Sequence, residues 1–224
     1  MEALLSFCKD FKPDIRVHLG DNWDFRNLRK GASDDERAHS LEDDWVAGLD
    51  FFNSFFDAKS ENHFLRGNHD ERLWGFARSA SGLLRDYAHD GIKRVEQACA
   101  RRKAKMLPYD SANGILKLGH LSILHGYAHG MSACRIHAAT YGNCLFGHVH
   151  TQESAPVPSL EPAEARSNAC LCIRDMDYAN AKIGKLRWAQ GWSYGHIFND
   201  GSYQLFQTRK INNQFHVATE IKGY

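Results

Sequence analysis

Apolar positions along the chain fall into short segments with two kinds of spacing. Over residues 2–11 and 41–56 they recur every three or four residues, which predicts two helices. Over 14–19 apolar and polar residues alternate, and 63–66 is a short apolar-rich run, so both segments are predicted strands. The polar, charge-rich stretch 25–44 is expected to be a long loop.

The rest of the chain continues this pattern of alternating elements. Helical spacing covers 71–105, with breaks near Ser81 and Asp90, and returns over 132–141. Further strands are predicted at 115–118, 121–124, 144–146, 169–173, 195–198 and 203–208. Asn199, Asp200 and Gly201 predict a hairpin turn between the last two. We therefore expect an α/β fold.

Four of the predicted strands lead directly into a polar corner. These corners are Gly20–Asp24, Gly67–Asp70, His125–Gly126 and Gly147–His150. In an α/β sheet, ligands gather outside the carboxyl ends of the strands, so four such corners can converge on one site. Each corner alone is more often a helix cap, a turn or a surface histidine than a functional site. The ordered set, with every member at a strand end, favours a functional site.

Composition narrows the class of protein. The 224 residues suffice for one large domain or two small ones, and 43% hydrophobic with 25% charged residues exclude a disordered, collagenous or coiled-coil chain. No apolar run reaches the roughly 18 residues of a membrane helix, and the first residues lack the pattern of a signal peptide. The six cysteines are then expected to be reduced thiols. These features predict a soluble, cytoplasmic protein without a membrane partner.

Charge and histidine content point in different directions. A net charge of +1 predicts no general attraction to nucleic acid. The 13 histidines are the unusual feature, because several stand beside glycine at the ends of apolar runs. That placement favours metal or phosphate chemistry.

The four corners also resemble the ordered motifs of a known family, the calcineurin-like metallophosphoesterases. The family's G-D-x-x-D, G-N-H-[DE], histidine–glycine and G-H-x-H motifs are similar to Gly20–Asp24, Gly67–Asp70, His125–Gly126 and Gly147–His150. The stretch GNHDERL that begins at Gly67 looks most like the phage and prophage branch. The resemblance covers nearly the whole chain. It implies two mixed β-sheets sandwiched between helices, in a single domain over 1–224 with a basic helical insertion at about 71–108.

The resemblance further implies a dinuclear metal centre at the strand ends. Asp21 would bridge two divalent ions, Mn, Fe or Zn; Asn68, His125 and His148 would complete one site, and His150 would belong to the other. Carboxylate, amide oxygen and imidazole suit these ions better than the all-thiolate sets of structural zinc. Two such ions can clamp a phosphate and activate a bridging water.

Catalytic and substrate-binding roles follow from the same resemblance. His69 would act on the leaving group or on the charge of the transition state, with Asp70 orienting it. Asp24 would support these groups from outside the coordination sphere. Arg26 and Arg29 follow this corner and are candidates for contacting a substrate phosphate, although loop solubility explains them equally well.

One motif of the family, D-x-H, is missing. It belongs on a first strand before the helix that begins at Glu2, and Asp14 and His18 are spaced too widely to replace it. We therefore expect the first core strand to be absent and the His150 site to lack two of its metal ligands. A miscalled start, a trimmed chain and a truly shortened protein are open explanations. A shortened protein would hold only one ion, turn over weakly or not at all, and expose a strand edge that favours a homodimer.

Two weaker signals lie outside the corners. Residues 71–105 carry nine basic and four acidic side chains, a net charge of +5, which suits either an arm that contacts nucleic acid or a solvated helix face. The apolar stripe through Val95 and Cys99 favours the helix face. Cys170 and Cys172 share one face of a predicted strand, and without a visible partner they are expected to be buried packing residues rather than ligands.

The sequence therefore predicts a metal-dependent phosphoesterase. A metal-activated hydroxide would attack phosphorus, and His69 would assist departure of the alcohol. Phosphodiester or nucleic-acid cleavage and phosphomonoester hydrolysis both stay open, because the loops at 25–44 and 71–108 set the substrate. The alternative is a non-catalytic phosphate- or nucleic-acid-binding remnant of the same fold that lacks the first metal-ligand motif.

Overall fold

The chain forms two compact units, each with its own helices and strands. A computed structural model describes residues 1–217 except 39, 80, 159, 161–162 and 173–182. Unit 1 comprises Met1–Gly114 and unit 2 comprises Ile115–Tyr224. Helices and several sheets are present in this part of the chain, so the α/β class is confirmed.

Unit 1 is built on a three-stranded parallel sheet in the order β1-β2-β3. Its strands are β1 (Ile15–His18), β2 (Glu61–Leu65) and β3 (Ala104–Leu107). His18 pairs with Phe64, so β1 and β2 end side by side. Because parallel strands present their carboxyl ends at one edge, the corners that follow β1 and β2 emerge next to each other.

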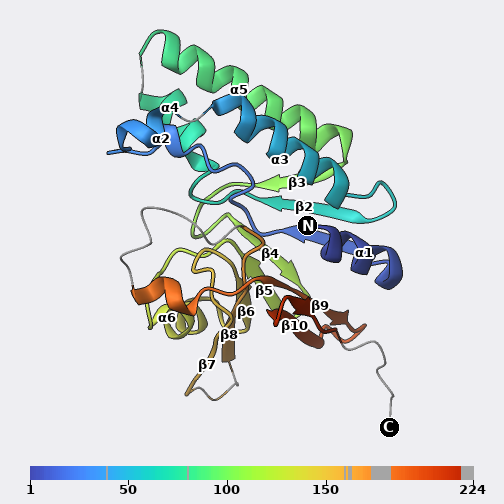
Figure 1. Cartoon of the computed structure of the whole chain (residues 1–224). Coiled ribbons are helices and arrows are strands. Elements are labelled where there is room, and N and C mark those ends of the chain that lie inside the picture. The colour runs from blue at the N-terminus through green and yellow to red at the C-terminus, as the bar shows by residue number, and fades with distance from the viewer. Residues whose placement is uncertain (39, 80, 159, 161–162, 173–182, 218–224) are drawn as a thin grey trace. The chain divides into compact units, whose positions relative to one another are not determined.

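The helices of unit 1 precede or connect these strands (Figure 1). They are α1 (Glu2–Phe11), α2 (Asp34–Ala38), α3 (Leu41–Phe55), α4 (Glu71–Ser79) and α5 (Leu83–Arg101), with a short 3-10 turn, η1 (Arg26–Leu28). α3 begins at Ser40, whose hydroxyl accepts a hydrogen bond from the Asp43 backbone N–H at 3.2 Å, a favoured helix cap. α3 and α5 pack together, with the Trp45 indole N–H donating to the Tyr87 hydroxyl at 3.0 Å.

An aromatic cluster forms the core of unit 1. Trp23, Phe25, Trp45, Phe52 and Phe64 are all almost completely buried. The Trp23 ring lies 5.4 Å from Trp45 and 5.8 Å from Phe52 between centroids. Burial of rings of this size is a dominant stabilising contribution in a core. Since Trp23 and Phe25 flank Asp24, the core itself holds the Gly20–Asp24 corner in place.

Unit 2 contains a mixed five-stranded sheet in the order β4-β5-β6-β8-β7. The strands are β4 (Ile115–Leu118), β5 (Leu121–Leu124), β6 (Cys144–Phe146), β7 (Ser154–Val157) and β8 (Ala163–Ser167). β5, β6 and β8 run parallel, whereas the edge strands β4 and β7 are antiparallel to their neighbours. Helix α6 (Ala133–Tyr141) packs on this sheet through Ala133, Cys134 and Ala138.

A second sheet of unit 2 is antiparallel, with the order β11-β10-β9. β9 (Gly191–Ile197) and β10 (Tyr203–Ile211) form the predicted hairpin, and β11 (Gln214–Phe215) pairs with the end of β10. The predicted turn is confirmed, because the Gly201 backbone N–H donates to the Phe198 carbonyl at 2.9 Å. The 3-10 segment η3 (Ile183–Arg187) precedes β9.

Several elements differ from the sequence prediction. The helical pattern expected as far as Lys105 ends at Arg101, and residues 104–107 are a strand. β7 and β8 lie between 146 and 169, where no strand was predicted, and the expected loop 25–44 contains η1 and α2. The strand expected at 169–173 is reduced to an isolated bridge at Cys170, and residue 173 lies outside the described residues. The described sheet of unit 1 is entirely parallel rather than mixed.

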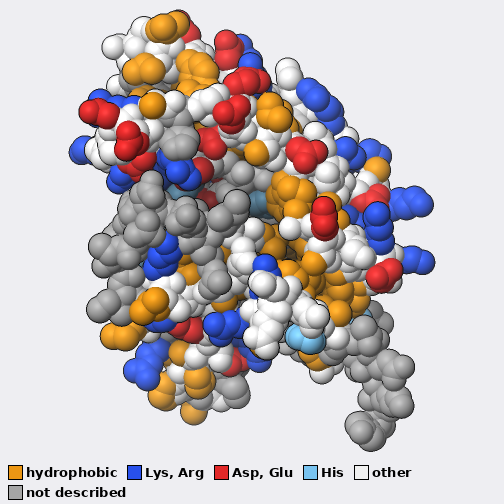
Figure 2. All heavy atoms as spheres, viewed as in Figure 1, with side chains coloured by type: hydrophobic (Ala, Val, Ile, Leu, Met, Phe, Trp, Pro, Cys, Tyr) orange, Lys and Arg blue, Asp and Glu red, His pale blue; other side chains and the backbone are white. Residues whose placement is uncertain are grey.

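Ion pairs offset part of the positive charge of the basic segment 71–105. At least five of its nine basic residues contact an acidic side chain: Arg72, Arg78, Lys93, Arg94 and Lys105. Three of the acidic partners, Asp24, Glu42 and Glu61, lie outside the segment and offset part of its net positive charge. Figure 2 shows acidic and basic side chains interspersed over this unit. Among the described helices, none is long and apolar enough to span a lipid bilayer.

Candidate functional site

Two glycines bring the first pair of corners into contact. A Cβ atom at Gly20, whose φ is +97°, would lie 2.5 Å from the Gly67 backbone nitrogen. A Cβ atom at Gly67 would lie 2.0 Å from the Asp21 Oδ1 atom. Only glycine fits at both positions, because no real Cβ approaches another atom so closely. The glycines therefore allow Asp21 to lie directly against the Gly67–Asp70 turn.

Asp70 ties the same two corners together through the backbone. Its Oδ2 accepts hydrogen bonds from the N–H groups of Asp21 and Gly67 at 2.7 and 2.8 Å, and its Oδ1 accepts from Asn22 and Trp23 at 3.1 and 3.2 Å. Burial and the charge of Asp21 raise the pKa of Asp70 to about 7, although the backbone donors lower it. Asp70 therefore holds the two turns together through their backbone N–H groups, and the expected orientation of His69 by Asp70 stays a prediction.

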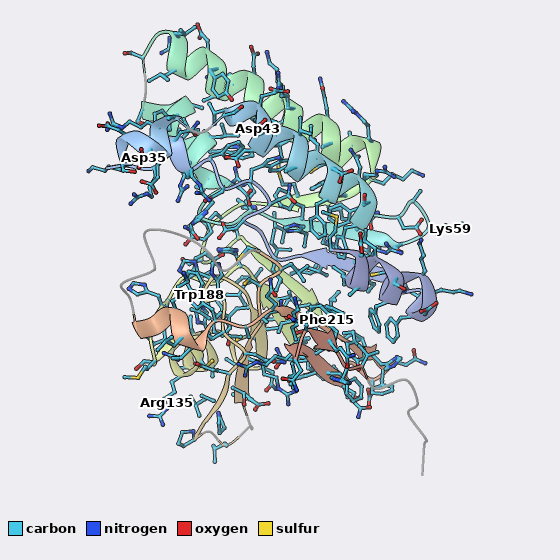
Figure 3. The ribbon with its side chains drawn as sticks, in the orientation of Figure 1. Asp35, Asp43, Lys59, Arg135, Trp188 and Phe215 are labelled. Atoms are coloured by element: carbon cyan, nitrogen blue, oxygen red, sulfur yellow. The ribbon has the colours of Figure 1, made fainter. Side chains whose placement is uncertain are left out.

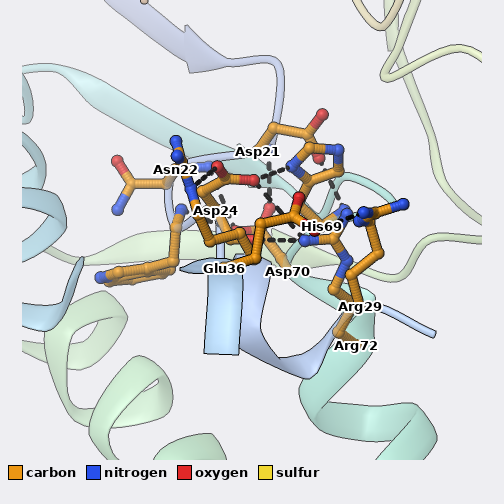
Figure 4. A network of polar contacts seen from close by, with 10 residues as sticks. Asp21, Asn22, Asp24, Arg29, Glu36, His69, Asp70 and Arg72 are labelled. Carbon is orange, nitrogen blue, oxygen red and sulfur yellow. Dashed lines mark hydrogen bonds and ion pairs between the residues drawn. The ribbon is translucent and has the colours of Figure 1, made fainter. Parts of the chain in front are cut away.

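Asp24 is the residue that holds the His69 ring (Figure 4). Its Oδ1 lies 2.6 Å from the His69 Nδ1. Burial raises the pKa of Asp24, but the hydrogen bond and charge of His69, together with Arg26 and Arg72, lower it to about 2. Burial lowers the pKa of His69, but Asp21 and Asp24 more than offset this and leave it raised. The predicted outer partner, Asp24, therefore acts on the predicted catalytic histidine.

Asp21 is fixed in the same network. The His69 backbone N–H donates to the Asp21 Oδ1 at 2.9 Å, so the carboxylate lies against the turn that carries the histidine. Asp21 has a φ of +55°, in the left-handed region that non-glycine residues rarely adopt. His148 and His150 share this feature, with φ values of +64° and +57°. Such backbone strain concentrates at functional sites, and here it occurs at three of the five predicted ligands.

The arginines near this corner have acidic partners. Arg26 Nε lies 3.1 Å from Asp24 Oδ2, and Arg72 contacts both the backbone carbonyl and the side chain of Asp24. Arg29 pairs with Glu36 at 2.5 Å, and its hydrogen bond lowers the pKa of that carboxyl. The expected phosphate contacts of Arg26 and Arg29 stay predictions.

In unit 2 the corners after β5 and β6 bring His125 and His148 together. Leu124 pairs with Phe146 in the parallel register, so the two strands end side by side. The two imidazole rings lie 5.3 Å apart between centroids, and His125 is almost fully buried. Two imidazoles at this spacing can face a common cation, which is the role that the resemblance implies for this pair.

A third histidine, His137 of α6, contacts the segment that follows the His125–Gly126 corner. Its Nε2 accepts a hydrogen bond from the Tyr127 backbone N–H at 3.0 Å, and its Nδ1 lies 2.7 Å from the Ala133 carbonyl. The ring stacks on Phe146 with centroids 3.9 Å apart. Burial lowers the pKa of His137, which favours the neutral form.

His150 lies beside two thiols that were expected to be buried packing residues. One ligand atom each from His150, Cys170 and Cys172 lie within 4.8 Å of one another, and all three side chains are only partly buried. The expectation that Cys170 and Cys172 are core residues is therefore wrong. The sequence could not reveal their partner, because His150 belongs to a different segment and becomes their neighbour only in the folded chain.

The structure thus groups the predicted site residues within each unit. Unit 1 brings together Asp21, Asp24, His69 and Asp70, and Asn68 belongs to the same turn. Unit 2 brings together His125 and His148, and separately places His150 with the two thiols. A cation shared by Asp21 and Asn68 with His125 and His148 would draw on both units and stays a prediction.

Sequence reasoning missed Arg72, which contacts Asp24, and His137, which contacts the Tyr127 backbone beside the His125–Gly126 corner. Arg72 follows the Gly67–Asp70 motif by two positions, and that proximity was the available signal. His137 carried no signal, since a histidine within a predicted helix looks like any surface residue. Comparison with protein-family models and with curated proteins gives no match for this sequence.

Proposed function

We propose that the protein is a metal-dependent phosphoesterase. Its cation would be held by the Asp21 carboxylate, the Asn68 amide oxygen and the imidazoles of His125 and His148. This donor set fits Mn²⁺, Fe²⁺ or Zn²⁺, which accept mixed oxygen and imidazole ligands. A cation bound there would supply charge neutralisation for a phosphate and lower the pKa of a water.

The contact between Asp24 and His69 carries this proposal. At 2.6 Å the carboxylate fixes the His69 Nδ1 as its partner, which leaves Nε2 as the ring nitrogen that can face a substrate. The raised pKa of His69 favours the protonated ring, the form needed to donate a proton to a departing alcohol. The hydrogen bond from the His69 backbone to Asp21 keeps this proton donor beside the proposed ligand.

The remaining polar residues of the corner keep the arrangement rigid. Asp70 fixes the backbone of both turns, because its carboxylate accepts hydrogen bonds from four backbone N–H groups. Arg72 fixes Asp24 by contacting its backbone carbonyl and its carboxylate. Preorganised groups of this kind reduce the reorganisation that a reaction requires. We therefore assign Asp70 and Arg72 positioning roles.

The first test is hydrolysis by the metal-depleted chain after addition of Mn²⁺. p-Nitrophenyl phosphate and bis(p-nitrophenyl) phosphate probe monoesters and diesters separately. We expect Mn²⁺-dependent release of nitrophenol from at least one of them, and Asp21→Asn should reduce it to the metal-free rate. Mn²⁺ binding without hydrolysis of either ester would contradict the proposed enzymatic activity. It would favour the alternative, a non-catalytic phosphate- or nucleic-acid-binding remnant of the same fold.

The second test concerns His69 and the leaving group. His69→Ala should slow hydrolysis of an alkyl phosphoester by roughly 10²–10⁴-fold, the usual contribution of a general acid. The loss should be much smaller for a nitrophenyl ester, whose leaving group needs little protonation. His89→Ala, at an exposed position of α5, is the matched control and should leave both rates unchanged. Equal losses on the two esters would remove His69 from this role.

A further inference from the structure

Cys170, Cys172 and His150 form a compact group of soft ligand atoms within unit 2. The two Sγ atoms lie 3.1 Å apart, and one nitrogen of His150 lies within 4.8 Å of both. Neither cysteine is in a disulfide. Two thiols and an imidazole are donors that zinc sites commonly use.

The backbone around residues 189–191 holds the three side chains together. The Ala189 N–H donates to the His150 carbonyl at 2.9 Å, and the Ala189 carbonyl accepts from the Cys170 N–H at 3.0 Å. The Gln190 side chain donates to the Cys172 carbonyl at 2.8 Å. One short segment therefore fixes the backbone of all three residues.

An aromatic side chain packs against the histidine of this group. The Trp188 ring meets the His150 ring edge to face, with centroids 4.7 Å apart. Trp188 directly follows the 3-10 segment η3 and is labelled in Figure 3. Packing of this kind restrains the ring, as the surroundings of a metal ligand generally do.

We propose that His150, Cys170 and Cys172 bind a zinc ion. With Zn–S bonds of about 2.3 Å, a tetrahedral ion holds two thiolates roughly 3.7 Å apart, so the observed sulfur separation needs only a small adjustment. Each thiol releases its proton to solvent on binding, and two thiolates then balance the charge of Zn²⁺. This site uses none of the four ligands in the proposed phosphoesterase centre and stands independently of it.

Cobalt provides a direct test, because Co²⁺ bound to thiolate gives a charge-transfer band in the near ultraviolet that oxygen and imidazole ligands do not give. The reduced, metal-depleted full chain is titrated with Co²⁺, and Zn²⁺ is then added. We expect the band to appear on Co²⁺ addition and to disappear as Zn²⁺ displaces Co²⁺. Cys170→Ala and Cys172→Ala should each weaken Zn²⁺ binding by at least the roughly 10–100-fold that loss of an outer-sphere partner costs, and should diminish the band.

Matched variants separate this site from the phosphoesterase centre. Cys99→Ala, at a buried position of α5, should retain the band, and so should Asp21→Asn. His150→Ala should weaken Zn²⁺ binding while leaving both thiols in place. A wild-type chain that gives no thiolate band, or a band that persists in the Cys170→Ala, Cys172→Ala double variant, would overturn the proposal. Quantitative Cys170–Cys172 disulfide formation with no zinc uptake by the reduced chain would overturn it as well.

Discussion

Two aspartates of unit 1 have opposite pKa shifts although both belong to the same pair of corners. Burial and the charge of Asp21 raise the pKa of Asp70 to about 7. Burial also acts on Asp24, but His69 and two arginines overcome it and lower the pKa to about 2. The difference follows from their partners, because Asp70 meets neutral N–H groups and Asp24 meets cationic side chains. Asp24 is therefore ionised over the pH range in which His69 would act as the proposed proton donor.

The lowered pKa of Asp24 predicts a specific dependence of stability on acid. Its ordinary pKa is 3.8, so the stabilisation is present above that value and is lost as the pH falls towards about 2. The shift corresponds to about 2 kcal/mol of unfolding free energy. In urea unfolding of the metal-free protein, Asp24→Asn should make the unfolding free energy fall less steeply as the pH is lowered from roughly 5. Asp35→Asn in α2 is the exposed control, and an equal effect there would contradict the assignment.

His137 predicts a second pH dependence at higher pH. Because burial lowers its folded pKa below the ordinary 6.5, the stabilisation is present above 6.5 and is lost as the pH falls below it. His137→Gln can keep both hydrogen bonds and cannot gain a proton, so its unfolding free energy should fall less over this range. The comparison is made by urea unfolding at several pH values, with His89→Gln as the exposed control. Identical slopes for wild type and His137→Gln would show that the buried ring does not titrate on unfolding.

At the scale of elements, the strand ends were predictable and several other boundaries were not. The runs before Gly20, Gly67, His125 and Gly147 are short and apolar, and the structure has a strand before each of them. β3 was missed because its residues also suit a helix. α5 ends at Arg101, and the chain turns at Lys103, whose φ is +52°, without a glycine to mark the end.

Strand β7 was missed for a different reason. Pro156 lies inside it and normally argues against a strand, but β7 is the edge of the five-stranded sheet, where a missing N–H is tolerated. The candidate site, too, could be predicted only in part from the sequence. Motif order indicated Asp24 and His69, but only the fold shows that Asp24 holds the ring.

The close contact between the Gly20 and Gly67 corners predicts how a substitution at Gly67 affects metal binding and stability. Gly67→Ala would place a Cβ 2.0 Å from Asp21 Oδ1, so it should displace that carboxylate and weaken Mn²⁺ binding, with an overpacking cost of about 1–3 kcal/mol in unfolding free energy. Gly75→Ala in α4 meets open space and should instead stabilise by roughly 0.5–1 kcal/mol. Calorimetric Mn²⁺ titration and urea unfolding test the pair. Unchanged Mn²⁺ affinity in Gly67→Ala would count against Asp21 as a ligand.

At the scale of the whole molecule, the proposed ligands divide by chemistry between the two units. Unit 1 supplies the oxygen donors Asp21 and Asn68, and unit 2 supplies the imidazoles of His125 and His148. A ligand that binds only the folded chain stabilises it by mass action, about 2.7 kcal/mol at a hundredfold excess over Kd, so Mn²⁺ should raise the melting temperature.

The most direct measurement is Mn²⁺ titration of the metal-depleted chain by calorimetry, because Mn²⁺ prefers oxygen and imidazole over the thiols of Cys170 and Cys172. The wild-type chain should show one binding event, and Asp21→Asn from unit 1 and His125→Asn from unit 2 should each abolish that same event. Cys170→Ser should retain it. A wild-type chain that binds no Mn²⁺, or an event lost in only one of the two ligand variants, would contradict a shared metal centre.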